Sequence, residues 1–139
     1  MDQARKDLSK YRLEQAKQCI KSAEVLYDID DYKGAANRSY YSIFHAMRSV
    51  LALEATDFKK HSAVISYFRK TYIKTGLFNV DLSDIISEAF DIRSDSDYDD
   101  FYLVSKEDIQ TQIKNAKYFC EEIEKYINRV IDKQSEEQQ

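Results

Sequence analysis

Residues that end helices and form tight turns are scarce in this chain, which has no proline and only two glycines among 139 residues. Proline and glycine usually mark turns and strand ends, so their scarcity favours a few long helices. An apolar content of 43% is enough for a hydrophobic core, and the length fits one domain. The sequence therefore predicts an all-α fold, an antiparallel bundle of about five helices.

Apolar residues recur at steps of three and four in five segments of the chain. These segments lie at about residues 3–28, 32–54, 61–75, 81–93 and from Ser105 onward. We expect these segments to be consecutive helices of one domain over residues 1–132. A polar tail over residues 133–139 is predicted to be disordered.

Residues between these segments carry typical helix-end signals. Asp30 and Asp31 interrupt the first pattern and can cap the second helix. Gly76 follows the third and suits a left-handed position after a helix. Ser105, with Asp108 three residues later, resembles a capping box. Residues 94–103 are acidic and aromatic, and they are expected to form a loop.

The second helical segment places Arg38 and His45 on one face. At about 100° per residue, the seven steps between them come to about 700°, within roughly 20° of two full turns. Ser42 and Ser49 fall within about 40° of Arg38 on the same count. The apolar residues cluster on the opposite side: Ala36, Tyr40, Ile43, Phe44, Met47, Val50 and Leu51. Small residues at Ser42, Ser49 and Ala52 would let another helix, or a phosphodiester, come close. Spacing alone fits a site, and it also fits two solvated side chains.

The run from Asp31 to Ala46, which contains this face, resembles the HEPN domain (higher eukaryotes and prokaryotes nucleotide-binding) in its small stand-alone prokaryotic form. The similarity continues through residues 60–65, the turn 75–77 and the segment 93–98, and it ends in the long helix after Ser105. It therefore covers nearly the whole chain. The resemblance implies an α-helical bundle, commonly dimeric, and in many members a metal-independent endoribonuclease of toxin, CRISPR or phage-defence systems.

Many HEPN domains carry an Arg, then four to six residues, then a His, and here Arg38 and His45 enclose six residues. The resemblance thus implies that these two residues are catalytic, with no metal ligand and no cofactor. Substrate-binding roles are expected for four neighbours: Asn37, Tyr41, Ser42 and Arg48. Tyr40 is expected in the core, because it points toward the apolar side of the helix.

RNA carries its own nucleophile, the 2′-hydroxyl next to the scissile phosphate. Cleavage requires a base, an acid and positive charge on the transition state. A His can serve as acid or base, and an Arg can bind phosphate oxygens. The second acid–base group could be His61 or the His45 of a symmetry mate. A twofold homodimer with two Arg38–His45 pairs across one groove is the preferred arrangement, as the resemblance also implies. His61 could equally be a helix cap or a hinge contact.

The net charge of −4 disfavours indiscriminate binding of nucleic acid. Charge is nevertheless segregated: residues 33–74 contain eight Lys or Arg against Glu54 and Asp57, whereas residues 79–108 contain ten acidic residues against Arg93 and Lys106. A locally positive groove and two ordinary solvated helix faces both fit this pattern. A salt bridge that holds the acidic segment is the expected role of Arg93.

Cys19 and Cys120 lie in separate helical patterns without metal-ligand spacing, as expected for buried thiols in a reducing cytoplasm. No signal peptide and no membrane span is expected, which predicts a cytoplasmic location.

Three functions remain open from the sequence. The first is a metal-independent endoribonuclease that acts on RNA as a toxin or defence effector and is restrained by a partner. The second is a non-catalytic module that binds a nucleotide or recruits a partner, often a minimal nucleotidyltransferase acting as the antitoxin. The third is a plain dimeric scaffold. The resemblance favours the first.

Overall fold

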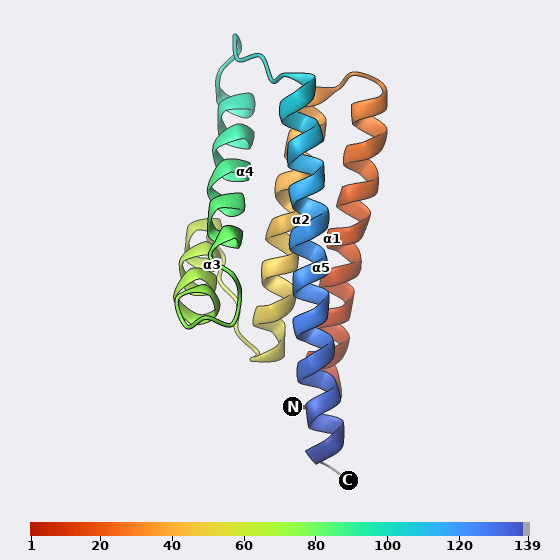
Figure 1. Ribbon diagram of the computed structural model, residues 1–139, viewed down its shortest axis with the longest axis vertical. Coiled ribbons are helices and arrows are strands. Elements are labelled where there is room, and N and C mark those ends of the chain that lie inside the picture. Colours follow the sequence, from red (N-terminus) through yellow and green to blue (C-terminus); the bar gives the residue numbers. More distant parts are fainter. Residues whose placement is uncertain (138–139) are drawn as a thin grey trace.

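The computed structural model describes residues 1–137, which form five α-helices and one short π-helix. Their bounds are α1 (Gln3–Asp28), α2 (Tyr32–Leu53), α3 (His61–Phe68), η1 (Arg69–Ile73), α4 (Asp81–Tyr98) and α5 (Lys106–Glu137). Helices α1, α2, α4 and α5 lie along the long axis of the molecule, and α3 sits beside the lower end of α4 (Figure 1). The predicted all-α antiparallel bundle is confirmed.

The predicted helix-end residues act as caps and turns. The carboxylate of Asp31 accepts a hydrogen bond from the backbone N–H of Gly34 at 2.9 Å, and Ser105 Oγ accepts one from the N–H of Asp108 at 3.0 Å. A Cβ at Gly34 would displace the Asp31 carboxylate from its present position, so this form of the cap suits glycine. Gly76 has a φ of +82°, the left-handed conformation expected after the third helix.

Three helix ends differ from the sequence prediction. The third helix changes to a π-helix at Arg69, and α4 continues to Tyr98, through residues predicted as a loop. An ion pair of 2.9 Å between Arg93 and Asp97, one turn apart, stabilises the added part of α4. Helix α5 extends to Glu137, so residues 133–137 of the tail predicted as disordered are helical, in keeping with their good helix formers Lys, Gln and Glu. The last two residues of that tail lie outside the described residues.

The small residues of α2, predicted to let another helix or a phosphodiester come close, are buried within the bundle. Ser42, Ser49 and Ala52 are at most 2% exposed. Ser42 Oγ donates a hydrogen bond to the carbonyl oxygen of Ala16 on α1 at 2.8 Å, and Ser49 Oγ donates one to that of Ala46 at 2.6 Å. The close approach that these residues permit is therefore made by a helix of the same chain.

The core lies between α1, α2 and α5 and continues to α3 and α4. Ile43, Met47, Leu51, Phe68 and Ile123 are among the side chains with almost no exposed surface. Both cysteines are buried free thiols, and burial raises the pKa of Cys120 to about 11. No helix within residues 1–137 is long and apolar enough to cross a membrane.

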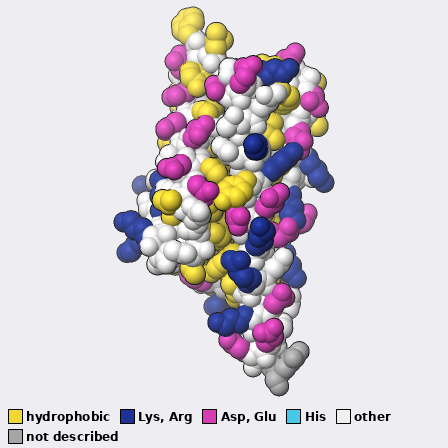
Figure 2. Space-filling view, viewed as in Figure 1, with side chains coloured by type: hydrophobic (Ala, Val, Ile, Leu, Met, Phe, Trp, Pro, Cys, Tyr) yellow, Lys and Arg dark blue, Asp and Glu magenta, His cyan; other side chains and the backbone are white. Residues whose placement is uncertain are grey.

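The connection between α4 and α5 is the most exposed apolar part of the described chain. Tyr98, Phe101 and Leu103 are 83%, 92% and 90% exposed. Figure 2 shows hydrophobic side chains at the top of the molecule, where Figure 1 places this connection, with acidic side chains spread over the upper half of the same face. This region is thus acidic and aromatic, as the sequence indicates, and its charge is opposite to that of the basic residues of α2.

Candidate active site

One ridge of α2 remains accessible after the helix has packed. Between Ala35 and Leu53, every side chain is buried except those of Asn37, Arg38, Tyr41, His45 and Arg48. We call these five residues the α2 ridge. Apart from Asn37, they follow one another at steps of three, four and three, the spacing of one helix face. The structure therefore brings together both predicted catalytic residues and three of the four predicted binding residues.

The fourth predicted binding residue, Ser42, does not belong to the ridge. Its exposed fraction is 0%, and its hydroxyl is already bonded to Ala16 and lies 3.4 Å from the sulfur of Cys120. The hydroxyl is therefore not accessible from the ridge, and the structure lends no support to the binding role predicted for Ser42. The angular position of Ser42 was predicted correctly, but α1 and α5 cover it.

Arg38 is held in place by its neighbours on α2. Asn37 Oδ1 accepts hydrogen bonds from Arg38 Nε at 3.0 Å and Nη2 at 2.7 Å. The guanidinium carbon lies 5.0 Å from the centre of the Tyr41 ring. Asn37 and Tyr41 thus fix the direction of the Arg38 side chain.

His45 is half-buried, and its Nδ1 is a buried atom without a hydrogen-bond partner in the described part of the chain. Most buried polar atoms are paired, so an unpaired ring nitrogen calls for a reason. Burial lowers the pKa of His45, and the positive charges of Arg48, Arg38 and Arg12 lower it further because they disfavour the imidazolium form. The ring is therefore neutral at pH 7 and able to accept a proton.

The second histidine, His61, lies in the same cluster. It is the first residue of α3, and its ring stacks on that of Phe44 with centres 4.0 Å apart. Its Nδ1 lies 2.9 Å from the hydroxyl of Tyr40, a core residue as predicted. The ring of Tyr41 is 5.7 Å from His61 and 6.1 Å from His45. His61 caps no helix through its side chain, and burial lowers its pKa, with Arg93 and Arg48 adding to the shift.

Arg93 reaches this cluster from α4. Its guanidinium carbon lies 5.2 Å from the ring centre of Tyr40 and 5.5 Å from that of Tyr41. Its Nη2 lies 3.5 Å from the hydroxyl of Tyr41, and its Nε pairs with Asp97. The salt bridge expected for Arg93 is present, and the same side chain contacts the α2 ridge, which sequence reasoning did not predict.

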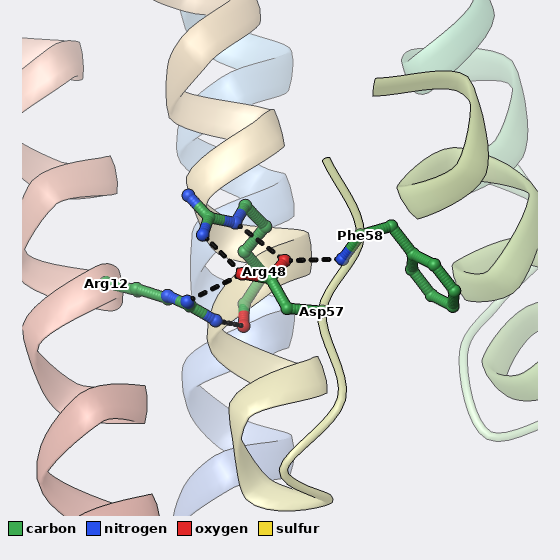
Figure 3. Close-up of polar contacts among 4 residues, drawn as sticks. All are labelled: Arg12, Arg48, Asp57 and Phe58. Atoms are coloured by element: carbon green, nitrogen blue, oxygen red, sulfur yellow. Dashed lines mark hydrogen bonds and ion pairs between the residues drawn. The ribbon is translucent and has the colours of Figure 1, made fainter. Parts of the chain in front are cut away.

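Asp57, on the connection between α2 and α3, joins three parts of the molecule (Figure 3). Its carboxylate accepts hydrogen bonds from Arg48 Nε at 3.2 Å and Nη2 at 2.6 Å, and from Arg12 Nη2 at 3.0 Å. Arg12 also donates to the carbonyl oxygen of Arg48 at 3.1 Å. The hydrogen bonds from Arg48 lower the pKa of Asp57, so the carboxylate is charged at neutral pH.

Sequence reasoning missed Arg12, Asp57 and the ridge contacts of His61 and Arg93. Arg12 and Asp57 are 45 residues apart, and no local pattern connects them. Arg12 did carry one signal, because it interrupts an otherwise apolar or small face of α1 that includes Ser9, Leu13 and Ala16. A charged residue on such a face indicates a buried partner.

The cluster as a whole is positive. It contains four arginines and two carboxylates: Arg12 and Arg48 pair with Asp57, Arg93 pairs with Asp97, and Arg38 stacks on Tyr41. A pocket of about 420 Å³ opens beside Arg48 and His61. No group of three or more His, Cys, Asp or Glu side chains within residues 1–137 could hold a metal ion. The chemistry available here is that of guanidinium groups, two neutral imidazoles and a tyrosine hydroxyl.

Comparison with protein families finds a match to the HEPN domain over residues 9–126. A protein of Methanocaldococcus jannaschii named "Putative toxin MJ0142" is 32% identical over 115 residues, which cover 83% of this chain and 78% of that protein. A Thermotoga maritima protein named only as a UPF0332 protein is 30% identical over 117 residues, 84% of this chain and 89% of its own. A second M. jannaschii protein, named as a toxin in the same terms as the first, is 26% identical over 119 residues, 86% of this chain and 88% of its own.

Proposed function

The chain belongs to the HEPN domain family, and on this premise we propose that it is a metal-independent endoribonuclease with Arg38 and His45 as catalytic residues. The α2 ridge carries the proposal. On a helix whose other side chains are buried from Ala35 to Leu53, the accessible ones are an arginine, a histidine and their immediate neighbours. Packing of the bundle does not require these residue types at the surface, whereas phosphate chemistry does.

The proposed reaction starts with the 2′-hydroxyl of RNA, which attacks the adjacent phosphorus while the bond to the 5′-oxygen breaks. The products are a 2′,3′-cyclic phosphate and a free 5′-hydroxyl. His45, neutral at pH 7 because its pKa is lowered, would accept the proton of the 2′-hydroxyl. Arg38 would bind the phosphate oxygens as negative charge develops.

The acid that protonates the 5′-oxygen has two candidates. His61 of the same chain shares Tyr41 and Phe44 with His45, which supports a complete site within one protomer. The alternative is the His45 of a second copy across a twofold groove, the arrangement that the family resemblance implies. Ser42, Ser49 and Ala52, the small residues that would let a helix of a second copy come close, are buried within the chain. The dimer therefore rests on the resemblance alone.

Two variants distinguish these arrangements. If His61 of the same chain is the acid, His61→Ala loses cleavage, and a dimer of one wild-type and one His45→Ala protomer keeps the activity of its wild-type site. If the His45 of a second copy is the acid, His61→Ala still cleaves RNA, and the mixed dimer is inactive because it has only one His45. Light scattering at micromolar concentration gives the oligomeric state, and a strict monomer excludes the composite site.

Cleavage itself is tested with a purified protein and a single-stranded RNA in excess EDTA. We expect cleavage to persist in EDTA and to leave 2′,3′-cyclic phosphate ends, and we expect DNA of the same sequence to remain intact because it lacks the 2′-hydroxyl. Loss of activity in EDTA, or cleavage of the DNA, contradicts the proposed mechanism.

In the cell, we propose that this activity makes the protein a toxin restrained by an antitoxin, as the names of two relatives suggest. If the antitoxin is a nucleotidyltransferase, Tyr41 is the expected acceptor, because its hydroxyl lies on the ridge next to Arg93. An attached nucleotide would add negative charge beside Arg38 and block the site. Intact-mass measurement after co-expression tests this assignment, and an unmodified chain or a modified residue other than Tyr41 rules it out.

A second candidate function is a non-catalytic module that binds a nucleotide. The pocket beside the ridge favours it, because 420 Å³ lies within the usual range for small-ligand sites. This function is supported if the wild-type protein binds nucleotides but never cuts RNA, and if His45→Ala leaves nucleotide binding unchanged.

A further inference from the structure

The pocket next to the α2 ridge is lined in part by two stacked rings. Phe44 of α2 and His61 of α3 lie with their ring centres 4.0 Å apart and their planes 30° apart. The complete lining consists of Phe44, Arg48, Asp57, Phe58, Lys59 and His61. Arg48 belongs both to this pocket and to the ridge, so a ligand in the pocket would adjoin the proposed cleavage centre.

An aromatic side chain is held at the rim of this pocket. Phe58 is 38% exposed, and one side of its ring packs on Tyr67, with ring centres 5.4 Å apart. Its backbone N–H donates a hydrogen bond of 2.8 Å to Asp57, whose carboxylate is fixed by Arg12 and Arg48. Figure 3 shows the Phe58 ring directed away from the two arginines. The ion cluster thus fixes the backbone at Phe58 while its ring stays outside the core.

Two cationic side chains, Arg48 and Lys59, line the same pocket as this ring. Lys59 is exposed and forms no ion pair with any residue in 1–137, and the guanidinium of Arg48 lies 5.9 Å from the Phe44 ring centre. Asp57 satisfies Nε and Nη2 of Arg48, while the remaining amino group, Nη1, takes part in no hydrogen bond within the described residues. An aromatic ring beside such cations suits a nucleobase and its phosphate.

We propose that this pocket binds one unpaired nucleotide of an RNA strand, with its base against Phe58 and its phosphate between Lys59 and Arg48. This inference rests on the proposed ribonuclease function and specifies its substrate class. A base within a duplex is covered on both faces by its neighbours and cannot stack on a protein ring. The pocket therefore makes the protein selective for single-stranded RNA.

Binding of fluorescent oligonucleotides tests the proposal without relying on cleavage. Short single-stranded DNA serves as the probe, because it carries bases and phosphates but cannot be cut through a 2′-hydroxyl. Phe58→Ala should weaken its binding roughly tenfold, the scale of losing one stacked base. Phe101→Ala is the matched control, since Phe101 is 92% exposed on the distant α4–α5 connection, and it should bind as the wild type does. Lys59→Gln, which breaks no ion pair in the described chain, should weaken binding by severalfold and checks the result if Phe58→Ala unfolds.

Four outcomes overturn the pocket. Either the wild type fails to bind the single strand, or Phe58→Ala and Phe101→Ala lose the same amount of binding affinity. Alternatively, the wild type binds a hairpin duplex as tightly as the single strand, or it binds a free mononucleotide as tightly as the strand. The last would make this a site for free nucleotides. If the wild type cuts RNA but Phe58→Ala binds the strand as tightly as the wild type, the pocket proposal fails and the ribonuclease proposal stands. If binding depends on Phe58 but the wild type never cuts RNA, the ribonuclease proposal fails and the pocket proposal stands.

Discussion

Two groups of polar residues lie on the same half of α2, and the structure treats them differently. Ser42 and Ser49 are buried within the bundle, whereas Arg38 and His45 remain accessible on the ridge. A serine hydroxyl needs only one nearby carbonyl oxygen, and Ala16 and Ala46 supply it. A guanidinium needs several acceptors: buried Arg12 finds them in Asp57 and the carbonyl oxygen of Arg48, whereas no carboxylate within residues 1–137 pairs with Arg38. The size and hydrogen-bonding demand of a polar side chain, as well as its angular position, therefore determine whether it becomes core or site.

The largest effect on RNA cleavage is expected from the accessible residues of the ridge. Arg38→Ala and His45→Ala should each reduce RNA cleavage at least about a hundredfold, which corresponds to about 2.7 kcal/mol of transition-state stabilisation. Their free energies of unfolding should change by less than about 1 kcal/mol, because neither side chain is fully buried. Single-turnover cleavage and urea unfolding measure the two quantities. A His45→Ala protein that fails to fold would assign His45 to the structure of the bundle.

The opposite result is expected on the covered side. Ser42→Leu should reduce the free energy of unfolding by about 1–3 kcal/mol, because a larger side chain overpacks the α1–α2 contact and leaves the carbonyl of Ala16 without its donor. Ser42→Ala, which keeps the small volume, should lose only about 1 kcal/mol. Urea titrations of both variants test this. If Ser42→Leu is as stable as the wild type but changes the oligomeric state, Ser42 lies at an intermolecular contact.

Stability should also depend on pH through the two histidines. Burial lowers the folded-state pKa of His45 and His61 below 6.5. As the pH falls through about 6.5, the unfolded chain binds more protons than the folded chain, so the free energy of unfolding decreases. His45→Gln should flatten this decrease, and urea titrations between pH 5 and pH 8, roughly the range in which histidines titrate, measure it. The same slope in wild type and variant would mean that His45 titrates normally.

The smallest effect concerns the electrostatics of the ridge. Arg48 is the first of the positive groups that lower the pKa of His45. Arg48→Gln should therefore raise the pKa of His45, since one charge that opposes the imidazolium is removed. NMR titration of the His45 ring detects the shift, with Lys125→Gln on α5 as a control for a general loss of charge. A lower pKa in Arg48→Gln would contradict this electrostatic account.

Helical periodicity predicted the helices, and local signals predicted where several of them end. Asp31, Gly76 and Ser105 mark helix ends through local hydrogen bonds and backbone geometry. Periodicity also predicted the angular position of Arg38 and His45. It could not predict that α1 would cover Ser42, since the angle around one helix does not specify which neighbour packs there. Residues brought together over long sequence distances, such as Arg12 and Asp57, leave almost no local signal.

The α2 ridge draws its supporting side chains from across the chain, with Arg12 from α1, Asp57 from the α2–α3 connection, His61 from α3 and Arg93 from α4. A ribosome that synthesises this protein therefore exposes Arg38 and His45 before Asp57, His61 and Arg93 emerge. If the site cuts RNA, the growing chain is harmless to the message and the ribosome that produce it until α4 has folded against α2. The order of the helices along the chain would then make the protein toxic only after most of it has been synthesised.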